Sequence, residues 1–100
     1  MTDVVTVTFE VCLPPAAAEG FSRMGSEGLE ATRNFPGCRG VRIVQHKDDP
    51  CRFLFLEQWD SEQAYRDYIA WRTERGEFQA LQQTATSTIT NVWPRVIVEV

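Results

Sequence analysis

The fold is decided by residues 50–60, PCRFLFLEQWD, where an apolar strand runs directly into polar and aromatic residues. Side chains along a strand alternate between its two faces, so Phe53 and Phe55 share one face while Leu54 and Leu56 share the other. Because both faces are apolar, this strand is expected in the middle of a sheet, with cover on each side.

The carboxyl end of this strand is where we expect a pocket. Glu57 and Trp59 continue the phenylalanine face, which brings a carboxylate and an indole N–H beside the core. Asp60 is a candidate helix N-cap, and Ser61 is another. A central strand that ends in polar and aromatic groups beside the start of a helix is a favourable place to bind a small molecule.

Length and composition indicate one globular domain over residues 1–100. The chain is 43% hydrophobic and 11% aromatic, which supplies the side chains of a core and disfavours disorder. The formal charge is −4 and Lys47 is the only lysine, so nucleic acid, whose phosphates need basic partners, is not expected as a partner. A core of this size is modest, so we expect a second subunit to cover an exposed sheet face.

Cysteine usage and the N-terminal residues favour a soluble cytoplasmic protein. Cys12, Cys38 and Cys51 are odd in number and lack metal-binding spacing, which favours buried thiols over a disulfide framework or a zinc site. The first residues lack the basic and long apolar regions of a signal peptide, and no apolar run approaches the ~20 residues that cross a bilayer. We therefore expect neither a metal nor a membrane partner.

Hydrophobic periodicity and turn residues divide the chain into strands and helices. Residues 3–12 alternate apolar and polar side chains as a half-buried strand does, and Pro14-Pro15 ends it. The polar run 84–88 is expected to be a fraying helix end or a loop. Strands are expected at 3–12, 38–46, 50–60 and 92–100, and helices at 16–33, 61–71 with an extension to 75 left open, and 77–86.

This order, β-α-β-β-α-β, predicts a ferredoxin-like α+β fold with an antiparallel sheet. The middle two strands form a hairpin through the turn 47–50, and counting back from it places His46 near Cys51 and Val44 near Phe53. The helices cover one sheet face, and the other face also carries Val, Leu and Ile. We therefore expect a homodimer whose sheets pack face to face.

Four short motifs carry a resemblance to a known family. They are FPGC at 35–38, DDPCRF at 48–53, EQWDS at 57–61 and EFQAL at 77–81. In this order and spacing they resemble the antibiotic biosynthesis monooxygenase family of dimeric α/β-barrels, over nearly the whole chain. Members include cofactor-independent oxygenases that oxidise phenols to quinones, quinol oxidases and haem-degrading enzymes. The resemblance implies a pocket between the sheet and the helices of each subunit, near Trp59.

Departures from the family pattern bear on the cofactor. Members often carry one His on the second helix and another just before the Phe of the following helix. Haem-degrading relatives use such a His as the iron ligand, together with an Asn on the first strand. This chain has Tyr-Arg-Asp-Tyr at 65–68 and places Thr6, Thr8 and Glu10 on that strand. The helix-borne His before Phe78 is absent as well. The resemblance therefore implies catalysis with O2 as co-substrate and without haem, metal or organic cofactor.

Aromatic residues near the expected pocket are the first candidates for the site. Trp59 can stack on an aromatic substrate and donate its N–H to a ketone or phenolate, or it can close the seam between sheet and helix as a core residue. Tyr65 and Tyr68 share one helical face, where their hydroxyls can bind a substrate or stay at the rim of the core. Trp71 either extends this aromatic wall or covers the core.

Charged residues supply candidates for a base and an anion-stabilising group. His46, the only histidine, is a candidate general base, because imidazole is the side chain most often used in that role. Its place beside the turn also suits a solvated surface residue. Arg42 or Arg52 can stabilise a phenolate or enolate. Each could instead form an ion pair with Glu10 or Glu57 at the rim or the dimer interface. Glu57 itself is either a desolvated carboxylate of raised pKa or a paired structural charge.

Together these patterns favour a cofactor-independent monooxygenase that oxidises a phenol, quinol or polyketide-type molecule. Two alternatives stay open: an isomerase or cyclase on the same scaffold, and a non-catalytic dimeric binding or accessory domain. A polar, ligand-sized pocket beside Trp59 favours an enzyme, whereas a cavity filled by aromatic rings favours the accessory role. The catalytic candidates are Trp59, Tyr68, Arg52 and His46, and the substrate-binding candidates are Tyr65, Trp71, Phe55, Phe78 and Arg42.

Overall fold

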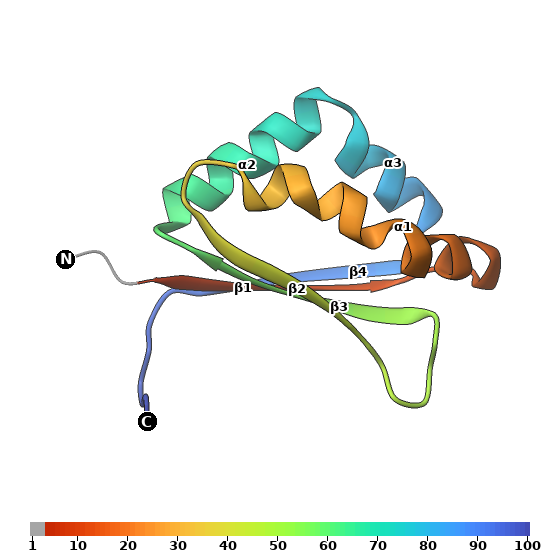
Figure 1. Cartoon of the computed structure of the whole chain (residues 1–100), viewed down its shortest axis with the longest axis horizontal. Coiled ribbons are helices and arrows are strands. Elements are labelled where there is room, and N and C mark those ends of the chain that lie inside the picture. The colour runs from red at the N-terminus through yellow and green to blue at the C-terminus, as the bar shows by residue number, and fades with distance from the viewer. Residues whose placement is uncertain (1–3) are drawn as a thin grey trace.

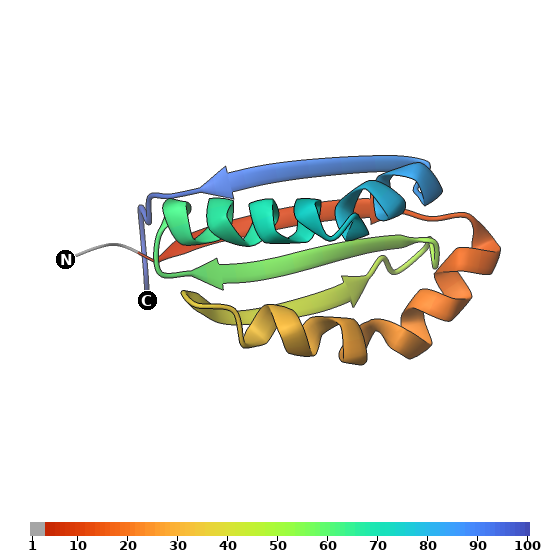
Figure 2. The same cartoon turned by 90° about the horizontal axis from the view of Figure 1, so that it is seen from above.

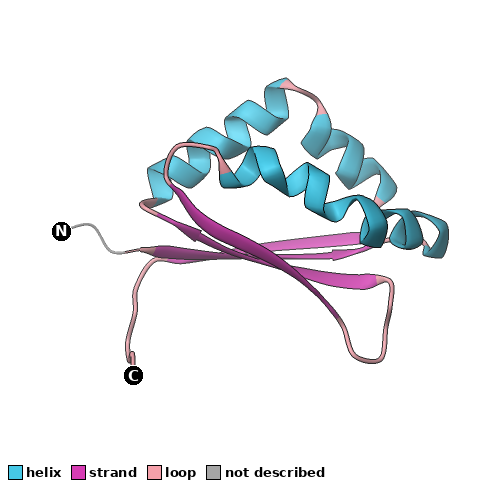
Figure 3. Ribbon diagram, in the orientation of Figure 1, coloured by secondary structure: helices cyan, strands magenta, loops and turns pink. Residues whose placement is uncertain are grey.

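The chain forms a two-layer α+β structure in which helices cover one face of an antiparallel sheet (Figures 1 and 3). The computed structural model describes residues 4–100, without the side chains of residues 22 and 24–27, so Asp3 at the start of the expected first strand lies outside the described residues. The strand order is β2-β3-β1-β4, and every neighbouring pair is antiparallel, which confirms the ferredoxin-like arrangement. The elements are β1 Val5–Cys12, α1 Pro15–Arg33, β2 Cys38–Gln45, β3 Arg52–Trp59, α2 Glu62–Glu74, α3 Glu77–Thr84 and β4 Ser87–Trp93.

The core lies between the helices and the buried face of the two central strands, β1 and β3. Every second residue of β1, from Val5 to Val11, is buried, and the threonines between them are partly exposed, as the alternation predicts. On β3, Phe53 is only 3% exposed and Trp59 is fully buried, whereas Leu54 on the opposite face is partly exposed. Figure 2 shows α1 running along β2 and α2 crossing over β1, so the helix-facing side of β3 lies between the two helices.

The core consists of two clusters, one at each end of this central face. One is built on Phe9 and Phe53, and the other on Val7 and Trp59. Residues 55 and 57 lie between Phe53 and Trp59 on the same face of β3, so they occupy the space between the clusters.

The junction between β3 and α2 depends on a cap and on a glycine. Ser61 is the N-cap of α2 and its side chain accepts a 3.1 Å hydrogen bond from the Ala64 N–H. Asp60, the other cap candidate, instead pairs with Arg39 at 2.5 Å. Gly37 before β2 has φ +91°, and a Cβ built there would lie 2.5 Å from the Ala64 Cβ. The backbone of this turn therefore packs against α2 closely enough that only glycine fits at position 37.

Gly37→Ala is expected to lower the free energy of unfolding by about 2 kcal/mol, because it combines a positive φ with an overlap against α2. Urea unfolding followed by circular dichroism measures the change. Gly20→Ala is the matched control: its Cβ meets nothing within 4 Å inside α1, so it should raise stability by roughly 0.5–1 kcal/mol. Equal effects of the two substitutions would contradict this account of the turn.

The last strand differs from the sequence prediction, which was wrong in placing it at 92–100. β4 begins at Ser87, inside the polar run expected to be loop, and ends at Trp93. Thr88 and Thr90 pair with Val11 and Phe9 of β1, so β-branched polar residues form this edge strand. Pro94, which lacks an N–H, follows the strand end rather than starting a strand.

The hairpin register also differs by one residue from the expectation. Val44 pairs with Leu54 rather than Phe53, and the His46 N–H bonds the Arg52 carbonyl rather than lying opposite Cys51. The cause is a local turn at Asp49, whose carbonyl accepts from the Arg52 N–H and whose side chain accepts from the Cys51 N–H. As a result Ile43 faces the helices, and Val44 lies 40% exposed on the open face.

Candidate active site

A cavity of about 280 Å³ lies between the sheet and the helices, in the space between the two core clusters. This volume is near the lower end for ligand sites, which suits a small aromatic molecule. Its walls are mostly aromatic and aliphatic, and a few polar groups interrupt them. The lining residues are Phe9, Phe21, Gly28, Leu29, Thr32, Ile43, Phe55, Glu57, Tyr65, Tyr68, Ile69, Arg72, Glu77, Phe78 and Leu81.

Glu57 is a buried carboxylate in this mainly apolar cavity. It is only 5% exposed, and its Oε1 accepts a 3.0 Å hydrogen bond from Trp59 Nε1. Burial raises the pKa of Glu57, because the charged form loses its hydration, and the hydrogen bond from Trp59 opposes part of this rise. A carboxylate of raised pKa inside a cavity can accept a proton from a bound hydroxyl, which is what a general base must do.

Tyr65 lies beside this carboxylate and is 8% exposed. Burial raises the pKa of its hydroxyl, and the negative charge of Glu57 raises it further. Tyr65 therefore keeps its proton, so that its hydroxyl can donate a hydrogen bond. The helical spacing that places Tyr65 on the cavity also places Tyr68 there, one turn along α2.

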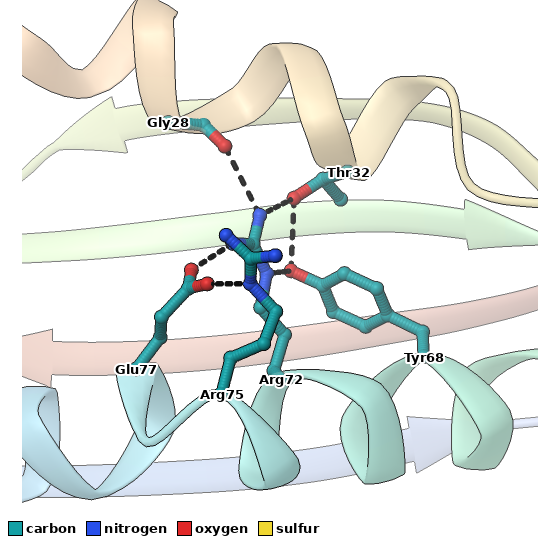
Figure 4. Close-up of polar contacts among 6 residues, drawn as sticks. All are labelled: Gly28, Thr32, Tyr68, Arg72, Arg75 and Glu77. Carbon is teal, nitrogen blue, oxygen red and sulfur yellow. Dashed lines mark hydrogen bonds and ion pairs between the residues drawn. The ribbon is translucent and has the colours of Figure 1, made fainter.

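A cluster of polar groups lines the cavity between α1 and α2 (Figure 4). Arg72 lies at its centre, with its side chain only 13% exposed. Its Nε donates to the Tyr68 hydroxyl at 3.0 Å, and one terminal nitrogen donates to Thr32 Oγ1 at 2.8 Å and to the Gly28 carbonyl at 3.1 Å. The other terminal nitrogen pairs with Glu77. One guanidinium thus links α1, α2 and the start of α3.

Glu77 balances the charge of this group. It pairs with both Arg72 and Arg75, and the hydrogen bond from Arg75 together with the charge of Arg72 lowers its pKa. It therefore stays ionised at neutral pH, and Arg72 is held by a fixed counter-charge. Arg75 in turn lies over the Trp71 ring, 4.8 Å from its centroid.

The structure brings four of the aromatic candidates to the cavity: Phe55, Tyr65, Tyr68 and Phe78. Trp59 is fully buried behind them, packs against Tyr68 with ring centroids 5.0 Å apart, and reaches the cavity through its hydrogen bond to Glu57.

Four of the other candidates lie outside the cavity lining. Trp71 is half-buried and packs on Phe35 and Tyr68. His46 is exposed beside the hairpin, where its Nδ1 accepts from the Asp48 N–H. The other two, Arg42 and Arg52, are exposed residues of β2 and β3, and Arg52 forms an ion pair with Glu10.

The polar residues that complete the site were not among the sequence candidates. Thr32, Arg72 and Glu77 come from three different helices, and only their docking brings them together. A partial signal exists for Arg72, which lies four residues after Tyr68 and so shares its helical face. The signal for Thr32 is its place on the apolar side of α1, where it is 2% exposed.

Among residues 4–100, no helix is long and apolar enough to cross a membrane. Within the same range, no cluster of three or more His, Cys, Asp or Glu side chains is arranged to hold a metal ion.

Comparison with known proteins agrees with the fold. The family model described as antibiotic biosynthesis monooxygenase matches residues 4–84. A solved antibiotic biosynthesis monooxygenase superimposes with a TM-score of 0.78 at 19% identity, covering 92% of this chain and 98% of that one. SnoaB, a cofactor-independent oxygenase from Streptomyces nogalater, gives 0.78 at 15% identity, covering 97% and 99%. A conserved protein from Methanosarcina mazei gives 0.80 at 19% identity, covering 93% of each chain. No curated protein sequence matches this chain.

Proposed function

The chain belongs to the antibiotic biosynthesis monooxygenase family, and from this premise we propose that it oxidises a small phenol or quinol with O2, without a metal or organic cofactor. The observation that carries the proposal is Glu57, a buried carboxylate that faces a cavity with aromatic walls. An electron-rich aromatic ring fits these walls, and its hydroxyl finds a proton acceptor there.

In the proposed reaction the substrate is a phenol with a free para position. Glu57 takes the hydroxyl proton, and the phenolate transfers one electron to O2, which gives a phenoxyl radical and superoxide. These combine at the para carbon, and Glu57 returns its proton to the peroxide. Glu57 then removes the para C–H proton as the O–O bond breaks, and the departing hydroxide takes that proton to leave as water. Phenol and O2 thus become quinone and water, in a four-electron oxidation that matches the reduction of O2.

The other residues support this chemistry by position. Tyr65 and Tyr68 donate hydrogen bonds to substrate oxygens, while Phe55 and Phe78 hold the ring. Trp59 acts as a positioning residue, because its N–H fixes one oxygen of Glu57. The apolar walls exclude water, which would otherwise solvate the phenolate and lower its reactivity.

Oxygen consumption tests the proposal. A panel of phenols, naphthols and dihydroxynaphthalenes is incubated with the protein in an oxygen electrode, and the products are analysed by mass spectrometry with ¹⁸O2. We expect one O2 consumed per quinone formed and one ¹⁸O atom in the product. The absence of oxygen uptake above the protein-free background across the panel would contradict the proposal.

A proton-transfer enzyme is the second candidate, because the same carboxylate could move a proton between two carbons of an enolisable substrate. Such an isomerase or cyclase needs no O2. Turnover of a substrate under argon at its aerobic rate would therefore favour this candidate over the oxygenase. An open cavity, rather than one filled by rings, argues against a purely accessory role.

We also propose that two copies pack sheet to sheet. The helices cover only one face (Figure 3), and the other face carries Val44, Ile89 and Trp93, which are 40%, 53% and 56% exposed, together with the partly exposed Leu54 and Leu56. An apolar sheet face of this kind is expected to be covered by a partner.

Leu56→Glu is expected to convert the dimer to a monomer. The substitution places a charge in the centre of the open sheet face, which the second copy buries in the proposed dimer. Sedimentation velocity at micromolar protein concentration measures the change. Gln63→Glu, on the exposed side of α2, adds the same charge and should leave the dimer intact. A wild-type protein that sediments as a monomer throughout this range would refute the assembly.

A further inference from the structure

The hydroxyls of Thr32 and Tyr68 form a pair whose protons can be assigned from their partners (Figure 4). The two oxygens lie 2.8 Å apart, so one of the hydroxyls donates to the other. Each oxygen also accepts a hydrogen bond from Arg72, whose nitrogens can only donate. The pair therefore holds two protons, of which one lies between the oxygens and the other must point elsewhere.

The environment of Thr32 decides which proton is shared. Both residues line the cavity, but Thr32 is only 2% exposed whereas Tyr68 is partly exposed, so the hydroxyl proton of Thr32 needs an acceptor within the protein. Among the described residues, the Tyr68 oxygen is the acceptor that lies within hydrogen-bond distance of it. Thr32 is thus the donor, and the Tyr68 oxygen accepts two hydrogen bonds, one from Thr32 and one from Arg72.

The proton of Tyr68 is then left without an acceptor in the described part of the chain. Tyr68 lines the cavity, which is the space into which this O–H bond can turn. We infer that Thr32 and Arg72 are positioning residues that hold the Tyr68 hydroxyl as a hydrogen-bond donor for an acceptor oxygen of the ligand, a carbonyl or a phenolate.

The ion pair with Glu77 makes this arrangement rigid. Arg72 uses its Nε for Tyr68 and its terminal nitrogens for Thr32, the Gly28 carbonyl and Glu77, so its plane is fixed from three helices. A donor that is already oriented loses little freedom when the ligand binds, which strengthens its effect on a developing negative charge.

This assignment rests on the proposed function only in taking the cavity as the ligand site, so its test uses a probe that cannot be oxidised to a quinone. The probe is 2-acetylnaphthalene labelled with ¹³C at the carbonyl, and naphthalene is the matched hydrocarbon. Difference infrared spectroscopy measures the C=O stretching frequency of the bound ketone, which falls when the oxygen accepts a hydrogen bond. Fluorescence titration measures both dissociation constants.

We expect the C=O frequency in the wild type to lie below that of the ketone in a hydrocarbon solvent. Tyr68→Phe should abolish this shift and raise the Kd of the ketone about fivefold, while the Kd of naphthalene stays within about twofold. Thr32→Val, which keeps the volume of the side chain, should reduce the shift, and Thr32→Ser should restore it. Circular dichroism of each variant checks the fold.

Three results would overturn the inference. If the ketone fails to bind saturably, or absorbs at the same frequency in the wild type and Tyr68→Phe, then Tyr68 is not the donor. If Thr32→Val matches the wild type in frequency, then Thr32 only packs against Tyr68 and does not orient it. Neither readout needs O2 or Glu57, so a failed oxygen-uptake test would leave this assignment standing, and its own failure would leave the oxygenase proposal open.

Discussion

Glu57→Gln is expected to lower kcat of phenol oxidation by about 100- to 10,000-fold, the range that a positioned general base contributes. Glutamine has nearly the same shape and still accepts the hydrogen bond from Trp59, so substrate binding should change little. The oxygen electrode measures kcat, and single-turnover absorbance of the phenolate shows whether deprotonation is the step that is lost.

The comparison with His46 sharpens this test. His46 is the other titratable candidate for the base, and it lies exposed at the hairpin, outside the cavity lining. His46→Ala is therefore expected to retain the wild-type rate. Glu74→Gln, at the exposed end of α2, controls for the loss of one charge. A large loss in His46→Ala with little change in Glu57→Gln would reverse the assignment of the base.

Glu57→Gln should also stabilise the folded protein at neutral and alkaline pH. Burial raises the pKa of Glu57 in the folded chain, so the folded state binds this proton more tightly than the unfolded state does. The corresponding stability is complete below the ordinary pKa of a glutamate and is lost as the pH rises through the raised pKa. Glu57→Gln should therefore melt above the wild type at pH 8, and the difference should shrink toward about pH 4.

Trp59→Phe is the second substitution with a large expected effect. It removes the N–H that donates to Glu57 and leaves part of a fully buried volume empty, which together should cost about 3 kcal/mol of unfolding free energy. Because the hydrogen bond from Trp59 lowers the pKa of Glu57, its loss should raise that pKa further. The base works only when ionised, so the acidic limb of the rate profile moves to higher pH.

The pH dependence of kcat/KM separates this role from simple packing. A residue that only fills space would lower stability and leave the midpoint of the acidic limb in place. Trp93→Phe is the control. Trp93 is 56% exposed on the open sheet face, away from the cavity, and its Nε1 donates a hydrogen bond to Thr8 Oγ1. An unchanged midpoint in Trp59→Phe would show that Trp59 does not act on Glu57.

The sequence predicts much of the fold because its central strands follow a strict alternation. The valines of β1 and the phenylalanines of β3 face the helices as expected, and Ser61 begins α2. The prediction failed for β4 because residues 96–100 are richer in valine and isoleucine than Thr88-Ile89-Thr90. Pairing with β1, rather than hydrophobicity, selects the segment that forms the strand.

The site is only partly visible in the sequence for a related reason. The aromatic lining follows from periodicity along α2 and β3, so Phe55, Tyr65 and Tyr68 could be expected. The contact between Arg72 and Thr32 joins residues 40 positions apart and depends on how α1 docks against α2. No local pattern encodes that docking, so Thr32 and Arg72 were not chosen as candidates. Of the charged candidates on the hairpin, Glu57 lines the cavity, whereas Arg42, His46 and Arg52 do not.

The three tryptophans occupy three different environments, so intrinsic tryptophan fluorescence can report on different parts of the protein. Trp59 is sealed beside Glu57, Trp71 is half-buried under Arg75, and Trp93 is more than half exposed on the open face. The emission of Trp59 should follow the ionisation of Glu57, whereas iodide should quench Trp93 in a monomer and lose access when a second copy covers it. Variants that retain one indole each could thus report acid–base state and self-association in the same cuvette, without a dye.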